Sequence, residues 1–254
     1  MKTLKISWML VILFLISGTI SNAQKNLFLI TSSSEDALVL FQDAIRNLEN
    51  AELDLYQENL KKALEKDPDF FMGHYHLAFF SNDSAVFYEH ANLALQKPKN
   101  QLRKAERLMQ NALKKNEKNP KANLSRFGKR LVKKHPDDIL GYYYLAFYQT
   151  MANDHQGCLK TYLNALKKTD NQGPIYNMIG YTNMNLNDYQ AAKIAFDKYI
   201  ELVPDHPNPY DSKGDYYMEL NAYTQAYNSY MKAYEINPEW SYDKAMKAKE
   251  MMEQ

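Results

Sequence analysis

Residues 173–206 read GPIYNMIGYTNMNLNDYQAAKIAFDKYIELVPDH, and residues 207–240 read PNPYDSKGDYYMELNAYTQAYNSYMKAYEINPEW. Gly180 and Gly214 hold the same position in these two stretches of 34 residues, as do Ala192 and Ala226. A period of this length is typical of helix-turn-helix units, each of which buries its apolar face only against its neighbours. The period extends upstream in three series, which are Ala146, Gly180 and Gly214; Cys158, Ala192 and Ala226; and Asn153, Asn187 and Asn221.

Each unit contains two segments with an apolar helical face and a turn between them. In the last unit, Tyr210, Gly214 and Tyr217 follow one another at i, i+4 and i+7, and Pro238 ends the second segment. The asparagine series falls between the two segments, where the chain must reverse. Because asparagine tolerates the left-handed conformation that ends a helix, we expect these residues to serve as turn residues.

The order of Tyr176, Ile179 and Gly180, followed by Ala192 and Phe196 and then a proline, resembles the tetratricopeptide repeat family. The resemblance implies an all-α protein, a right-handed α-solenoid in which small residues let paired helices approach closely. It also implies a non-enzymatic scaffold that binds a protein or an extended peptide in the concave groove of the solenoid.

The pattern also predicts how the chain is organised. The hydroxyl run from Thr31 to Ser34 can begin the first helix. We expect an N-terminal tail at 24–34, divergent repeat-like helices at 35–81, irregular basic helical pairs at 82–136, three regular units at 139–238 and a capping helix at 239–254.

Met1–Ala23 has the pattern of a secretory signal peptide. Lys2 and Lys5 precede the nine-residue apolar run Trp8–Ile16, and small or polar residues follow up to Ala23. The alternatives are a membrane anchor or a buried first helix, but a span needs about 20 apolar residues. We therefore expect an exported bacterial member of the family, cleaved near Ala23, periplasmic or secreted, with no transmembrane span in the mature chain.

The sequence predicts no enzyme, no cofactor and no metal site. His74 and His76 are two residues apart and point to different sides of a helix, and the other histidines lack metal-ligand spacing. His155 and Cys158 could meet at i, i+3, but Cys158 occupies the slot of Ala192 and is expected to be a small buried residue. The chain contains no phosphate-binding glycine-rich loop and no nucleophile elbow.

Within the family, side chains at the fifth and ninth positions of each first helix line the concave groove. The resemblance therefore implies a groove that grades from aromatic to acidic. An acidic end favours a neutral or basic extended peptide as the ligand. The implied groove residues are Tyr143, Phe147, Asn177, Tyr181, Asp211 and Asp215.

A second candidate surface lies in the segment from Lys97 to Lys134, which holds fourteen basic residues against Glu106 and Glu117. A basic stripe attracts anions, so the alternative function is a cell-envelope adaptor that docks on anionic glycan, lipid or acidic protein. The other interpretation is a solvated face, or one docked on acidic residues of the same chain. Nucleic acid is not expected, because an exported protein seldom meets it and no binding motif is present. The patch residues are Arg126, Lys129, Arg130, Lys133 and Lys134.

Overall fold

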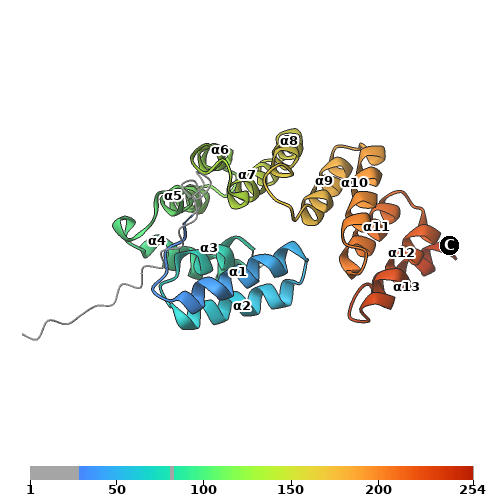
Figure 1. Ribbon diagram of the computed structural model, residues 1–254, viewed down its shortest axis with the longest axis horizontal. Helices are drawn as coiled ribbons and strands as arrows, with labels where there is room; N and C mark the ends of the chain where they lie inside the picture. The colour runs from blue at the N-terminus through green and yellow to red at the C-terminus, as the bar shows by residue number, and fades with distance from the viewer. Residues whose placement is uncertain (1–28, 81–82, 254) are drawn as a thin grey trace, which may run out of the picture.

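The computed structural model describes residues 29–80 and 83–253. This part of the chain forms thirteen α-helices and one short 3-10 helix, and it contains no strand (Figure 1). The protein is therefore an all-α helical solenoid, as the sequence predicted. The expected signal peptide Met1–Ala23 and its cleavage site lie outside the described residues.

Each helix packs mainly against the helices that precede and follow it in the sequence, and consecutive helices run antiparallel. Their bounds are α1 Glu35–Glu49, α2 Leu53–Lys66, α3 Phe71–Phe80, α4 Ser84–Gln96, η2 Lys99–Gln101, α5 Lys104–Lys118, α6 Ser125–Lys134, α7 Ile139–Met151, α8 His155–Ala165, α9 Gly173–Asn185, α10 Tyr189–Leu202, α11 Pro207–Glu219, α12 Tyr223–Ile236 and α13 Tyr242–Met252.

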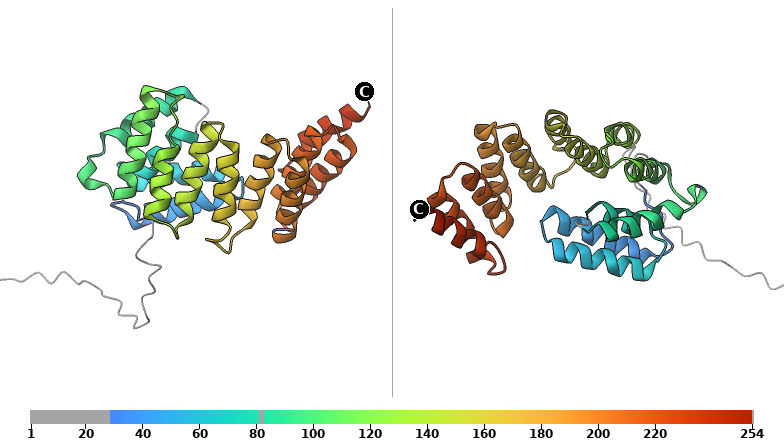
Figure 2. Two further views of the ribbon diagram at one scale, coloured as in Figure 1. Left: turned by 90° about the horizontal axis from the view of Figure 1, so that it is seen from above. Right: turned by 180° about the vertical axis from the view of Figure 1, so that it is seen from behind.

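The solenoid curves so strongly that its N-terminal hairpin faces its middle. Figure 1 shows α1 and α2 on the inner side of the arc made by α6 to α9, and Figure 2 shows the same arrangement from behind. Side chains bridge the gap: Tyr143 of α7 donates a hydrogen bond of 2.8 Å to Glu49 at the end of α1, and His206 lies 3.6 Å from Glu52. The concave face of α7 to α9 is thus partly covered by α1.

The small repeat residues lie where paired helices cross. A Cβ atom on Gly180 would overlap the ring of Phe196, and one on Gly214 would overlap the ring of Tyr230. All six members of the Ala146 and Cys158 series, the two glycines included, are buried. The prediction of close approach is confirmed. At each glycine, the space that a side chain would take is occupied by an aromatic ring of the paired helix.

The asparagine turns are also confirmed. Asn153, Asn187 and Asn221 have φ angles of 54°, 59° and 55°, in the left-handed region. The α1–α2 turn uses Ala51 for the same conformation, with φ 60°. The asparagines therefore serve the reversal of the chain within each unit.

The segment predicted as irregular helical pairs forms α4, η2, α5 and α6. Gly128 of α6 crosses α7 so closely that a Cβ atom would lie 2.6 Å from the Cα of Leu145. Glu106 of α5 is fully buried and accepts hydrogen bonds from the backbone of Thr31 at 2.9 Å and of Arg103 at 2.8 Å. The described end of the tail is therefore docked on α5, and Ser34 caps α1 as predicted.

The last helix, α13, packs against α12. Ala245 and Ala248 are fully buried and belong to one cluster with Ala226 and Tyr230. A single amphipathic helix thereby covers the apolar face that the last repeat presents. This arrangement is the predicted cap.

Candidate functional site

The concave face contains a cavity of about 300 Å³ between α1, α7 and α9. Three of the six residues predicted for the groove, Tyr143, Phe147 and Asn177, line it together. Their positions on the first helices of successive units bring them to one side, and α1 closes the opposite side. The apolar part of the wall includes Ile45, Leu48, Phe80, Leu140 and Met178.

Glu49 contributes a carboxylate to this cavity. It accepts hydrogen bonds from the Tyr143 hydroxyl at 2.8 Å and from Nδ2 of Asn171 at 3.2 Å. Burial raises the pKa of Glu49 above its ordinary value, although these two hydrogen bonds act in the opposite direction. Sequence reasoning missed this residue, because nothing periodic connects α1 with a position 94 residues away.

Asn177 adds a polar group without a partner. Its side chain is 8% exposed, and its Oδ1 is buried with no hydrogen-bond partner in the part of the chain that the structure describes. A buried amide of this kind carries a desolvation penalty that a bound hydrogen-bond donor would offset. The cavity thus combines apolar walls with one carboxylate and one unsatisfied amide.

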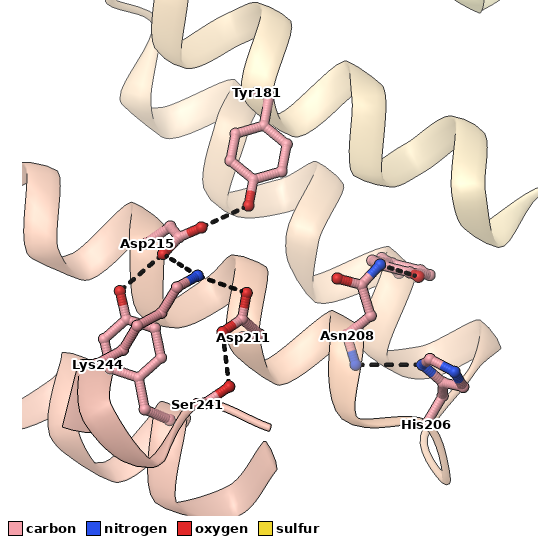
Figure 3. A network of polar contacts seen from close by, with 9 residues as sticks. Tyr181, His206, Asn208, Asp211, Asp215, Ser241 and Lys244 are labelled. Atoms are coloured by element: carbon pink, nitrogen blue, oxygen red, sulfur yellow. Dashed lines mark hydrogen bonds and ion pairs between the residues drawn. The ribbon is translucent and has the colours of Figure 1, made fainter. Parts of the chain in front are cut away.

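The other three predicted groove residues form a separate polar network, shown in Figure 3. Tyr181 donates to Asp215 at 2.7 Å, and Tyr230 donates to the other oxygen of Asp215 at 2.8 Å. Lys244 of the capping helix lies 2.8 Å from Asp211 and 3.0 Å from Asp215. Ser241 also donates to Asp211, at 2.6 Å.

This network changes the expected charge of the groove. Although burial opposes it, hydrogen bonds with Asp211 and Asp215 raise the pKa of Lys244, which therefore stays protonated. Two carboxylates share one ammonium group, so most of their hydrogen-bonding capacity is used inside the protein. The acidic end predicted from the sequence is present, but it is engaged by a lysine that the sequence analysis did not include.

The five residues of the predicted basic patch lie on α6, and all five are exposed. Phe127 and Leu131 form the buried face of the same helix. No salt bridge among the described residues involves α6, and Arg126 packs over the ring of Phe127 at 4.7 Å. Residues 126–134 therefore present unpaired cations to solvent.

The histidines and the cysteine have structural surroundings. His76 is buried between the hydroxyl groups of Tyr56, at 3.0 Å, and Tyr144, at 2.7 Å, whereas His74 contacts His90 at 2.9 Å. Burial lowers the pKa of His76 to about 3, so it is neutral. Within residues 29–80 and 83–253, no group of three or more potential ligands could hold a metal ion.

Cys158 is 1% exposed, as expected for a residue in an alanine slot. Its Sγ lies 3.5 Å from the Thr150 hydroxyl and 3.7 Å from the Ala146 carbonyl. Burial raises the pKa of its thiol, which disfavours the reactive thiolate. Cys158 is therefore a small core residue.

Comparisons with known proteins agree with this fold. A family model described as tetratricopeptide repeat matches residues 173–206 and 208–239. The crystal structure of yeast Tom70 is similar over 82% of this chain, with 15% sequence identity and a TM-score of 0.56. This chain covers 46% of that structure, so it spans about half its length. At this level of identity the likeness concerns the fold alone.

Two further solved structures match with lower TM-scores. The crystal structure of a MamA protein has 16% identity, a TM-score of 0.40 and coverage of 80% of this chain and 93% of its own. MamA from residue 41 to its end, from Desulfovibrio magneticus RS-1, has 14% identity, a TM-score of 0.45 and coverage of 59% and 93%. A search of curated proteins gave no match. In the described part of the chain, no helix combines the length and the apolar character needed to cross a membrane.

Proposed function

The chain carries tetratricopeptide repeats, and on this premise we propose that it is a non-enzymatic scaffold that binds a protein or an extended peptide on its concave face. The observation that supports this most is the cavity where Tyr143, Phe147 and Asn177 meet α1. An extended segment of a partner could bury an apolar side chain there and donate a backbone N–H to the unpaired Oδ1 of Asn177. The network around Asp215 would then act as a rigid border of the groove.

A site-directed crosslink tests this function. A photoreactive phenylalanine analogue replaces Thr150, which is exposed beside the cavity, or Lys232, which is exposed on α12. We expect a crosslinked partner from position 150 alone, and loss of that product when Phe147→Ala is added. Equal crosslinking from both positions, or insensitivity to Phe147→Ala, would contradict binding on the concave face.

The exposed cations of α6 support a second candidate function, an adaptor that docks on an anionic partner. Because none of them is paired with an acidic residue in the described chain, docking on the protein's own surface does not account for them. We expect Lys129→Glu combined with Arg130→Glu to abolish salt-sensitive binding to phosphatidylglycerol vesicles. The matched control is Lys247→Glu with Lys249→Glu, two exposed lysines on α13 that form no salt bridge in the described chain. A similar loss of vesicle binding in both double variants would show that binding depends on the net charge of the protein and not on α6.

We also propose that the protein functions outside the cytoplasm, on the basis of the sequence pattern in Met1–Ala23. Cell fractionation with N-terminal sequencing tests this. We expect an envelope or extracellular form that begins at Gln24. A cytoplasmic form that retains Met1 would exclude export.

A further inference from the structure

We infer that the cavity between α1, α7 and α9 is a subsite for one large apolar side chain that neighbours a lysine or arginine in the bound segment, with Glu49 receiving the cation. This inference rests on the proposed function, since it names the chemistry of the segment that the concave face binds. Four properties of the cavity lead to it.

The first property is size. Pockets for drug-sized ligands span about 300 to 1,000 Å³, and this cavity lies at the lower limit. It can take a single phenylalanine, leucine or methionine side chain but not a helix. The occupant is therefore a point of anchorage in an extended segment.

The second property is the wall. The rings of Phe80 and Phe147 stack with centroids 4.9 Å apart, and both line the cavity together with Met178. Aromatic rings and a thioether form favourable contacts with aromatic and aliphatic groups. The wall accordingly selects a large apolar side chain.

The third property is charge. The Glu49 carboxylate uses two acceptor positions for Tyr143 and Asn171, and a carboxylate has about four. No salt bridge in the described chain involves Glu49: Arg46, whose charge acts on Glu49 from the same helix, forms its salt bridge with Asp43. The remaining acceptor positions are thus available to a lysine or arginine of the ligand, whereas an acidic ligand would be repelled.

The fourth property is the unpaired amide of Asn177, which is more than nine-tenths buried and lines the same cavity from α9. A peptide backbone supplies an N–H donor for Oδ1. An apolar molecule without polar groups would leave Oδ1 of Asn177 without a hydrogen bond and Glu49 without a cation. The set of wall, carboxylate and amide is complementary to an apolar residue next to a basic one, presented by an extended backbone.

Three capped hexapeptides, AAFKAA, AAFEAA and AAAKAA, test the inference against the full mature chain. The methyl group of Met178, labelled with ¹³C, reports binding by NMR at peptide concentrations up to about 5 mM, where millimolar contacts are visible. We expect AAFKAA to bind at least about tenfold more tightly than either of the other two. Binding of none of them, or equal binding of all three, would overturn the inference.

Substitutions assign the selectivity to the cavity. Glu49→Gln keeps the shape of the side chain and should abolish the preference of AAFKAA over AAFEAA. Glu35→Gln, an exposed carboxylate in the first turn of the same helix, is the matched control and should leave the preference unchanged. Thr150→Trp should block the cavity for every peptide. If the Glu49→Gln variant kept the preference for AAFKAA over AAFEAA and had an unchanged Tm, Glu49 would not be part of the binding site.

These outcomes separate the inference from the proposed function. If the crosslink from position 150 identifies a partner whose affinity is unaffected by Glu49→Gln and by Thr150→Trp, the scaffold function holds and the subsite is wrong. If no partner reaches position 150 while AAFKAA binds selectively, the cavity recognises this chemistry, and the proposed scaffold role fails.

Discussion

Two regions of the concave face occupy equivalent repeat positions and differ in what faces them. Tyr143 and Phe147 on α7 correspond to Asp211 and Asp215 on α11, two periods later. The α7 pair faces α1 across an open cavity. In contrast, Lys244 of the capping helix forms salt bridges with both residues of the α11 pair. Consequently the acidic residues of the second region are satisfied internally, and the first region retains a carboxylate without a cation.

The difference shows that a repeat position does not define a ligand contact by itself. Whether a residue at the fifth or ninth position is available to a ligand depends on the helix that packs against it. In both regions this helix lies outside the regular repeats. Glu49 and Lys244 both arise from such elements, α1 and α13.

The largest effect is expected for Gly214→Ala. The added Cβ would overlap the ring of Tyr230, whose hydroxyl holds Asp215, so the helix pair and the network must both shift. Overpacking of this kind destabilises by about 1–3 kcal/mol, measurable as a lower urea midpoint. Gly141→Ala on α7 is the matched control, because its Cβ would lie at an ordinary 3.5 Å from Val132. Equal destabilisation by both would disprove the steric argument.

A smaller loss is expected for Lys244→Met. The substitution keeps the length of the side chain but leaves Asp211 and Asp215 facing each other without a cation. Since Lys244 is about half exposed, solvent screening limits the cost to about 1 kcal/mol. Lys244→Arg should retain most of the stability. A thermal unfolding midpoint identical to wild type in Lys244→Met would show that the network contributes nothing.

The repeat region could be predicted from the sequence because its determinants are periodic and local. Gly180 and Gly214 recur at the helix crossings, and Asn187 and Asn221 recur at the turns, each for a reason that involves only neighbouring residues. Gly128 was missed for the opposite reason. Its contact with Leu145 joins α6 to α7 outside the repeat period, so no spacing reveals it.

The candidate site could be predicted only in part. The resemblance assigned Tyr143, Phe147 and Asn177 to the groove, and these residues do line one cavity. It could not place α1 opposite them, because the curvature of the solenoid is the sum of many small rotations between helices. Glu49 and Lys244, which decide the charge of the two regions, therefore became visible only in the structure.

Stability should respond to pH in opposite directions in two parts of the molecule. Burial raises the pKa of Glu49, so its ionisation disfavours the folded state, and its contribution to stability falls as the pH rises from 4.5 through the raised value. Although burial opposes it, Lys193 and Lys213 lower the pKa of Asp197, whose contribution is present above pH 3.8 and is lost as the pH falls through the lowered value.

Thermal melts between pH 3 and pH 7 measure these contributions. Relative to wild type, Glu49→Gln should become more stable as the pH rises, and Asp197→Asn should become less stable. The two effects should be smaller than that of Gly214→Ala, because each involves a single partly exposed group. If the melting temperatures of both variants and of the wild type changed with pH in parallel, the pKa of each carboxyl would be the same in the folded and unfolded states, and the prediction would be wrong.

The smallest effect is expected for Asn177→Ala. Asn177 and Asn208 are both buried, at 8% and 3% exposure, but Asn208 donates to the Tyr199 hydroxyl at 3.0 Å whereas Oδ1 of Asn177 has no partner among the described residues. Removing a satisfied hydrogen bond costs about 1 kcal/mol, while removing an unsatisfied polar atom relieves a desolvation penalty. Asn208→Ala should therefore lower the free energy of unfolding, and Asn177→Ala should change it by less than about 0.5 kcal/mol. Binding of AAFKAA should show the reverse order, with a loss in Asn177→Ala and none in Asn208→Ala. Equal destabilisation by the two substitutions would mean that the Asn177 amide is satisfied within the protein, and it would then have no unused hydrogen bond to offer a ligand.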